Sequence, residues 1–201
     1  MKKFTYQEIE LVAEYLRKGK IIAFPTETVF GLGIIYDDSS AYEHLIKIKR
    51  RSPEKPFSLM LSSTIEISKY ALLSKEEIKV INEFMPGDLT ILVRAKDNLP
   101  FWTHLGTNVI GIRVPADKQL RRLISLVGAP LLVPSANREG QKPLVNDKEV
   151  IEEFGHEIDG IILGEAKSFL PSSVVKVYDK VEILREGRIS LKEIMNCTKE
   201  N

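Results

Sequence analysis

The sequence is poor in the features on which several classes of protein depend. It contains a single cysteine, Cys197, so no internal disulfide can form, which is typical of a reducing compartment. No apolar run approaches the length of a membrane span. The basic start at residues 1–3 is followed by polar residues rather than by the apolar stretch of a signal peptide. These features predict a cytoplasmic protein with no membrane partner.

Excess charge and familiar catalytic patterns are also scarce. The 29 basic and 28 acidic residues leave a formal net charge of +1, so no global field attracts the chain to nucleic acid. The three histidines, His44, His104 and His156, are far apart in the sequence and form no triad or zinc-type spacing. The phosphate-binding pattern GxxxxGK[ST] is absent as well. A nucleotide site in this chain would therefore need a local cluster of cations.

What the sequence does contain is an alternation of predicted strands and helices. With 201 residues, the chain is predicted to form one domain over residues 1–201. Helical patterns, most of them with a capping residue, are expected to begin at Thr5, Ser40, Ser74, Ala116, Asp147 and Ser190. Short apolar runs predict strands at 21–24, 57–61, 89–93, 109–113, 131–133, 161–163, 174–177 and 181–184. This alternation predicts an α/β fold with a mixed sheet.

The stretch Pro25–Gly33 is the strongest candidate for a functional site. It follows the apolar run 21–24, and its proline ends the strand because it has no N–H to donate. Hydroxyl and carboxylate side chains come next, then Gly31 and Gly33, which would let the backbone approach a ligand or turn at positive φ. Ligands of open α/β sheets bind just outside the carboxyl ends of strands. The alternative is an ordinary turn rich in Thr and Gly.

A cationic cluster follows the second predicted helix, which is expected to end at Ser52-Pro53. Lys49, Arg51 and Lys55 lie close together in this part of the sequence. Cations near a helix C-terminus complement the helix dipole, and charge runs are usually solvated. A triphosphate, however, needs several fixed cations, and arginine adds bidentate geometry. The residues alone leave both interpretations open.

Further polar side chains lie at the ends of later strands. Taken singly, an arginine at a strand end is more often part of a surface ion pair, and a Ser-x-Asn sequence more often caps a helix or forms a turn. The alternative is that these residues share one site, where an asparagine offers two donors and an acceptor. The residues concerned are Arg113, Ser135, Asn137, Ser172 and Arg185.

Taken in order, these motifs resemble the YrdC/Sua5 family, the threonylcarbamoyl-AMP synthases, also called TsaC. Pro25–Gly33 is similar to the family signature, and Lys49-x-Arg51 with Ser135-x-Asn137 is similar to its KxR…SxN tetrad. The segments 86–90, 111–115, 172–174 and 184–187 match its later motifs. The resemblance covers roughly residues 5–190, and several motifs in one order make it specific. The length is that of the short form, without the extra C-terminal domain of longer members.

The resemblance implies a fold, a reaction and a set of partners. The fold is an open, twisted α/β sheet with a large concave basic cavity. The enzyme is a nucleotidyltransferase that joins L-threonine, bicarbonate or CO2, and ATP into threonylcarbamoyl-adenylate and releases pyrophosphate. Other proteins then transfer the threonylcarbamoyl group to position 37 of tRNA, giving t6A, so tRNA or double-stranded RNA is a further expected partner. Mg²⁺ is expected as the cofactor, held through ATP rather than by a protein metal site.

The resemblance also assigns residues by their place in the motifs. Those expected to hold threonine are Thr28, Arg113, Ser135 and Ser172. Those expected to contact ATP are Arg51, Lys55, Asn137 and Arg185, together with the backbone near Val109 and Val145. Lys49 and Arg51 are expected to be catalytic, facing phosphate or carbamate. The positions that depart from the family pattern are Phe30, Ser52, Met60, Asp88, Pro134 and the pair Arg138-Glu139.

Three other functions are compatible with parts of this pattern. An RNA-binding module could use the same concave surface without catalysis, although the near-zero net charge and the lack of interleaved aromatic residues count against it. A carbamoyl-adenylate enzyme would need acylphosphatase-like and zinc-finger segments, which this chain lacks. An inactive scaffold subunit would not need to retain the four residues of the tetrad.

Overall fold

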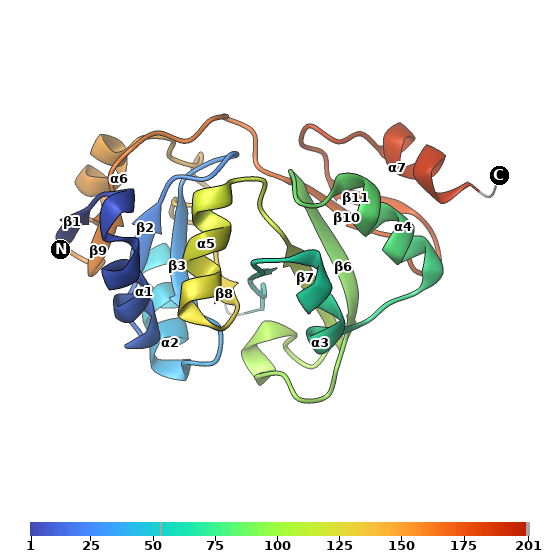
Figure 1. Ribbon diagram of the computed structural model, residues 1–201, viewed down its shortest axis with the longest axis horizontal. Coiled ribbons are helices and arrows are strands. Elements are labelled where there is room, and N and C mark those ends of the chain that lie inside the picture. Colours follow the sequence, from blue (N-terminus) through green and yellow to red (C-terminus); the bar gives the residue numbers. More distant parts are fainter. Residues whose placement is uncertain (53, 200–201) are drawn as a thin grey trace.

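The computed structural model describes residues 1–52 and 54–199, so Pro53, part of the expected end of the second helix, lies outside the described residues. Within them, eleven strands form one mixed sheet with the order β1-β9-β2-β3-β8-β4-β7-β6-β10-β11, and β5 pairs with β6 (Figure 1). The strands are β1 (Lys2–Phe4), β2 (Ile22–Phe24), β3 (Gly31–Ile35), β4 (Leu59–Met60), β5 (Ala71–Leu72), β6 (Leu89–Ala95), β7 (Val109–Arg113), β8 (Leu131–Leu132), β9 (Gly160–Ile162), β10 (Ser173–Lys176) and β11 (Glu182–Arg185). This architecture confirms the predicted α/β class and mixed sheet.

Helices cover both halves of this sheet. They are α1 (Ile9–Arg17), α2 (Ser39–Lys49), α3 (Ile67–Tyr70), α4 (Lys75–Phe84), α5 (Lys118–Val127), α6 (Asp147–Phe154) and α7 (Leu191–Thr198). In Figure 1, α1, α2, α5 and α6 lie in the half with β1, β9 and β2, and α4 and α7 lie in the half with β10 and β11. No helix in the described ranges has the length and apolar character needed to cross a membrane.

The helix starts agree with the predicted caps at three places and differ at three. The capping boxes that begin at Thr5, Ser74 and Ser190 are formed. The second helix is instead capped by Asp38, whose carboxylate accepts from the N–H of Ala41. The later predicted starts were wrong by one or two residues, because the side chains that cap are Asn146 for α6 and Asp117 for α5. At its other end, α2 stops at Lys49 because Arg50 adopts a left-handed conformation with φ 49°.

The hydrophobic core lies on both faces of the sheet. Successive residues of β2 belong to different buried clusters: Ile22 and Phe24 pack in the cluster with α1 and α5, whereas Ala23 packs in the larger cluster. Since successive side chains of a strand point to opposite faces, the two clusters lie on opposite sides of the sheet. This sandwich fixes the positions of the loops that leave the strand ends.

The glycines of the Pro25–Gly33 stretch lie in a strand that the sequence did not predict. β3 pairs with β2 in an antiparallel hairpin, so Phe24 lies opposite Gly31. A Cβ atom on Gly33 would lie 2.5 Å from the ring of Phe24, and one on Gly31 would lie 2.6 Å from Val133. These glycines therefore make room for neighbouring side chains, and only residues 25–30 form the loop at the end of β2.

Candidate active site

A cavity of about 130 Å³ opens where the β2–β3 loop faces the ends of other strands of the sheet. Its wall is formed by that loop, by the segment around β4, by the carboxyl end of β7, and by the start of β10 and the end of β11. Six of the residues predicted from the sequence line it, although they come from distant parts of the chain: Thr28, Arg51, Arg113, Ser135, Ser172 and Arg185.

Arg113 lies on the floor of this cavity and is held by the β2–β3 loop. Its Nη1 donates to Oγ1 of Thr28 at 3.0 Å, and its Nη2 donates to Oε1 of Glu27 at 2.8 Å. The same carboxylate oxygen accepts from the N–H of Ala116 at 2.8 Å, just before α5. Asp88 lies 3.9 Å from the guanidinium. The Nε of Arg113 is buried and has no hydrogen-bond partner among the described residues.

A second arginine approaches the cavity from β11. Arg185 donates from Nε to the carbonyl of Ser172 at 2.9 Å and from Nη2 to its Oγ at 3.2 Å. The Oγ of Ser172 also shares a hydrogen bond of 2.8 Å with Oγ1 of Thr90. This close approach requires a glycine two residues after the arginine, because a Cβ on Gly187 would lie 2.4 Å from the carbonyl oxygen of Pro171.

Three arginines contribute to the wall of the cavity. Arg51, Arg113 and Arg185 all line it, and none of the described lining residues is acidic. Partial burial, and then the charges of Arg113 and Arg51, lower the pKa of Arg185 below its usual value. Guanidinium groups that repel one another in this way are stabilised by a bound anion, so the cavity suits a ligand with carboxylate or phosphate groups.

Lys55 lies outside the cavity wall and is paired with an acidic residue. Its Nζ lies 2.5 Å from Oε1 of Glu139, and the other carboxylate oxygen accepts from the N–H of Ser52 at 2.7 Å. Arg51 lies over the ring of Phe57, with 4.9 Å between the guanidinium carbon and the ring centroid. The loop that carries both cations is thus tied to the loop after β8.

Lys49 lies behind the cavity rather than in its wall. Its side chain is buried, and Nζ donates to the carbonyls of Ser135 at 2.5 Å and Asn137 at 2.6 Å. Burial, followed by the charges of Arg51 and Arg138, lowers the pKa of Lys49 to about 7. In this structure the lysine fixes the backbone of the Ser-x-Asn turn.

The amide of Asn137 is also used within its own turn. Its Nδ2 donates to the carbonyls of Arg138 at 3.0 Å and Gln141 at 2.7 Å, and its Oδ1 accepts from Oγ of Ser135 at 2.6 Å. The sequence left open whether this motif forms a turn or faces a ligand. In the structure, the side chain of Asn137 makes the contacts expected of a turn. Ser135 lines the cavity and Asn137 does not.

The two backbone positions expected near ATP also lie outside the cavity wall. Val109 is at the start of β7, on the face that it shares with Gly111 and Arg113, because alternate residues of a strand point the same way. Val145 donates its N–H to Glu149 at 3.3 Å and accepts from the N–H of Ala166 at 2.7 Å.

Two lining or supporting residues were not singled out from the sequence. Glu27 lies within the Pro25–Gly33 stretch, and Thr90 lies in the segment 86–90 that matches a family motif. Their positions inside these motifs could therefore have identified them as site residues. Their contacts with Arg113 and Ser172 depend on the pairing of distant strands, which the sequence does not state.

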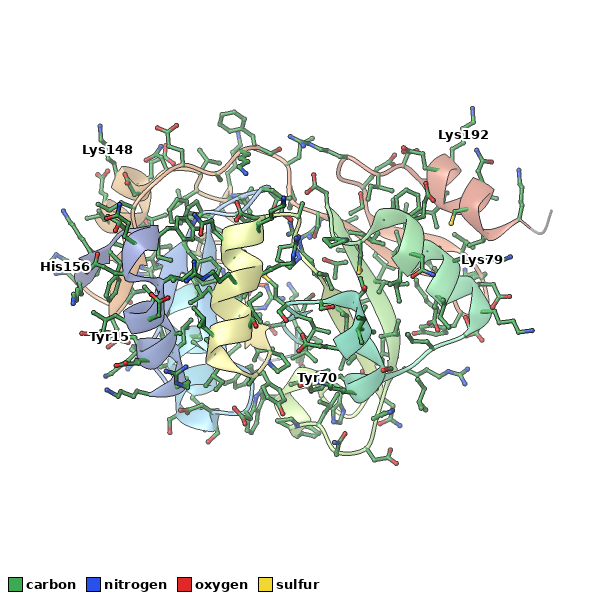
Figure 2. All side chains as sticks on the ribbon, in the orientation of Figure 1. Tyr15, Tyr70, Lys79, Lys148, His156 and Lys192 are labelled. Carbon is green, nitrogen blue, oxygen red and sulfur yellow. The ribbon has the colours of Figure 1, made fainter. Side chains whose placement is uncertain are left out.

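Metal ligands and histidines do not contribute to this cavity. In residues 1–52 and 54–199, no group of three or more His, Cys, Asp or Glu side chains could hold a metal ion. None of the three histidines lines the cavity, and Figure 2 shows His156 at the outer edge of the molecule, in the half that holds β1.

Comparisons with known proteins agree with the motifs. The sequence profile of the Sua5/YciO/YrdC family, which carries the description "telomere recombination", matches residues 14–187. This chain belongs to that family. A protein of Methanocaldococcus jannaschii is 34% identical over 200 residues, which is 95% of this chain and 93% of the relative. The threonylcarbamoyl-AMP synthase of Vibrio campbellii is 30% identical over 184 residues, which is 90% of this chain and 100% of the relative.

A solved structure of the same family shares the fold. Sua5 of Pyrococcus abyssi, complexed with L-threonine, matches with a TM-score of 0.89 and 29% identity. The match covers 98% of this chain and 59% of that protein, so the chain spans about three fifths of its length. This similarity confirms the open, twisted sheet implied by the sequence motifs.

The positions that depart from the family pattern fall into two groups in the structure. Phe30, Met60 and Pro134 line the cavity and add apolar surface to it. Arg138 is buried, pairs with Glu153 and Glu157 of the α6 region and donates to the carbonyl of Ile48. Burial raises the pKa of Asp88, although Arg113 beside it acts in the opposite direction.

Proposed function

We propose that this chain is a threonylcarbamoyl-AMP synthase that forms threonylcarbamoyl-adenylate and pyrophosphate from L-threonine, bicarbonate or CO2, and ATP. The observation that carries the proposal is the floor of the cavity, where Arg113 and Thr28 present donors beside two further arginines. The names of the family relatives and the threonine complex of the Pyrococcus protein support the same activity. The product would serve the t6A modification of tRNA, with separate proteins transferring the group.

In this proposal threonine binds on the cavity floor. Its carboxylate would accept from the guanidinium of Arg113, and its hydroxyl or amine would contact the hydroxyls of Thr28, Ser135 and Ser172, which all line the cavity. Buried hydroxyls and a fixed guanidinium hold a zwitterionic ligand in one orientation, which lowers the entropy cost of the reaction. The cavity volume of about 130 Å³ suits an amino acid.

The chemical step needs positioning and charge neutralisation rather than a protein nucleophile. The threonine ammonium first loses a proton to solvent. The amine nitrogen then forms a bond to the carbon of CO2 and releases a second proton to solvent, which gives an N-carboxylate. One oxygen of that carboxylate forms a bond to the α-phosphorus of ATP, and the bond to the pyrophosphate leaving group breaks in line with it. Arg51 and Arg185 would offset the charge that develops on the phosphates, with Lys55 at the outer end. Lys49 would support this site by holding the Ser135–Asn137 turn.

A magnesium ion fits this site only as part of the nucleotide. Both carboxylates beside the cavity floor, Glu27 and Asp88, already lie against Arg113. Mg²⁺ bound to ATP would supply further neutralisation of phosphate charge, as in other phosphoryl transfers. The residues that would receive the complex are Arg51, Lys55 and Arg185.

The test is pyrophosphate release by the purified protein. We expect release with ATP and Mg²⁺ to require both L-threonine and bicarbonate, and omission of either to abolish it. Release without threonine would contradict the proposed substrate. An RNA-binding module would instead show no turnover and an RNA affinity that falls steeply with salt.

A further inference from the structure

The feature from which we draw a further inference is the carboxylate of Glu139, at the outer side of the cavity. It accepts from Nζ of Lys55 at 2.5 Å and from the N–H of Ser52 at 2.7 Å, and its own N–H donates to the carbonyl of Lys49 at 2.9 Å. A single side chain thus joins the loop after α2 to the turn after β8. Both segments carry residues expected to contact ATP.

These contacts are the ones that a phosphate group would use. An ammonium and a backbone N–H that converge on one anion form a site for phosphate or carboxylate alike. The donations from Lys55 and Ser52, together with the charge of Arg51, keep the pKa of Glu139 below its usual value. The carboxylate is therefore ionised at neutral pH, and it repels any other anion that approaches Lys55.

The cavity is smaller than the pockets that usually enclose a ligand as large as a nucleotide. Pockets that enclose larger ligands usually measure about 300–1,000 Å³. The present cavity measures about 130 Å³, and its wall on this side is Arg51 and Pro56. A nucleotide must therefore extend beyond this cavity. Glu139 holds Ser52 and Lys55, which are next to Arg51 and Pro56 in the chain.

We propose that Glu139 lowers the affinity of this protein for ATP, because its carboxylate competes with the nucleotide phosphates for Lys55 and for the N–H of Ser52. The inference rests on the proposed function. It assigns a specificity-determining role to Glu139. When ATP binds, a phosphate group then replaces the carboxylate of Glu139 at Lys55 and at the N–H of Ser52.

The experiment measures ATP binding by calorimetry, with Mg²⁺ and without bicarbonate, so that no turnover occurs. We expect Glu139→Gln to lower the Kd for ATP by about threefold, the scale of an exposed ion pair. The Kd for L-threonine should stay unchanged, because Glu139 does not line the cavity and its side-chain hydrogen bonds are with Ser52 and Lys55 rather than with Arg113. In about 1 M salt the difference between the two proteins should become smaller, because salt weakens ion pairs between exposed side chains.

Glu54→Gln is the matched control. Glu54 is an exposed residue of the same loop, and its carboxylate takes part in no ion pair among the described residues. Its substitution removes the same charge without touching Lys55, so it should leave the Kd for ATP unchanged. An equal gain of affinity in both variants would mean that net charge alone acts, which would overturn the proposal.

Three other results would also overturn it. A weaker ATP affinity in Glu139→Gln would show that the carboxylate organises the loop for the nucleotide instead of competing with it. An unchanged affinity, with normal turnover in the wild-type protein, would reject the inference and leave the proposed function intact. Absence of any ATP binding to the wild-type protein would reject both.

Discussion

Glu27 and Arg113 form a buried ion pair, with 2.8 Å between Oε1 and Nη2 and only 9% of each side chain exposed. The pair joins the β2–β3 loop to the carboxyl end of β7, which are 86 residues apart in the chain. The carboxylate also accepts from the N–H of Ala116, so one oxygen fixes both the guanidinium and the backbone before α5. Arg113 is thereby held at the cavity floor before any substrate binds.

Glu27→Gln is predicted to weaken threonine binding and to destabilise the protein. Loss of one charge from a buried pair leaves the other uncompensated, which costs about 3 kcal/mol in the free energy of unfolding. We expect the KM for L-threonine to rise about tenfold, with the KM for ATP little changed. Steady-state pyrophosphate release and urea unfolding measure the two effects.

The control for this variant is a pair of equal length at the surface. Arg122 and Glu10 also lie 2.8 Å apart, but about 60% of each side chain is exposed. Glu10→Gln should change the free energy of unfolding by less than about 1 kcal/mol and leave both KM values as they are. A threonine KM that stays normal in Glu27→Gln would contradict the role assigned to the buried pair.

Arg51→Ala is predicted to abolish adenylate formation while the fold remains intact. Arg51 lines the cavity, and in the proposed function its guanidinium, with that of Arg185, would offset charge on the phosphates. We expect kcat for pyrophosphate release to fall by at least about a hundredfold, the scale of a lost charge-stabilising donor. Circular dichroism and thermal unfolding should match the wild-type protein. Near-normal turnover would reject the role of Arg51.

The neighbouring arginine provides the control. Arg50 is exposed, does not line the cavity and has a φ of 49°, a conformation that glycine adopts without strain. Arg50→Gly therefore removes a charge next to Arg51 without adding backbone strain. Activity should be retained, which would also settle by experiment which of the two adjacent arginines serves the site.

The sequence predicted the convergence of the site better than the contacts within it. Motif order indicated that Thr28, Arg113, Ser135, Ser172 and Arg185 share one site, and all five line the same cavity. It could not show that a neighbouring glutamate neutralises Arg113, because that contact depends on how β7 packs beside the β2–β3 loop. Spacing along a chain identifies residue types at strand ends but does not give the partner of each donor.

In the fold, too, features that depend on local sequence were predicted better than those that depend on pairing between distant segments. Apolar runs and caps predicted most elements, because burial and capping are local properties. β3 was missed, because two glycines in five residues lower its strand propensity, and the space they leave is filled by Phe24 and Val133. The short strands β1 and β5 depend on pairing with β9 and β6, which no local pattern specifies.

Lys49 is predicted to make the free energy of unfolding depend on pH in the alkaline range. Its pKa falls from the ordinary 10.5 to about 7 in the folded chain, so the unfolded chain binds one more proton between these values. Stability therefore rises with pH in this window, by up to about 1.4 kcal/mol per unit. Below pH 7 both states hold the proton and this dependence ends.

The comparison that isolates this effect is Lys49→Met. The substitution keeps much of the buried volume and removes the titrating group. We expect the slope of the unfolding free energy against pH, measured with urea from pH 8 to 10, to be lower by about 1 kcal/mol per unit than in the wild-type protein. Equal slopes would show that the hydrogen bonds that Lys49 donates to the carbonyls of Ser135 and Asn137 keep the lysine charged.

Gly187→Ala is predicted to reduce activity by displacing Arg185. The added Cβ would lie 2.4 Å from the carbonyl oxygen of Pro171 and 2.8 Å from the nitrogen of Ser173, so β11 must move away from β10. Overpacking of this kind costs about 1–3 kcal/mol, and the shift would break the hydrogen bonds from Arg185 to Ser172. We expect thermal unfolding at a lower temperature and a rise in the KM for ATP.

The control variant is Gly128→Ala, at the end of α5, where no atom lies within 4 Å of the new Cβ. It should lose about 1 kcal/mol of stability because of the positive φ at this position, and it should keep its activity. Equal loss of activity in both variants would mean that reduced stability, and not the position of Arg185, explains the effect.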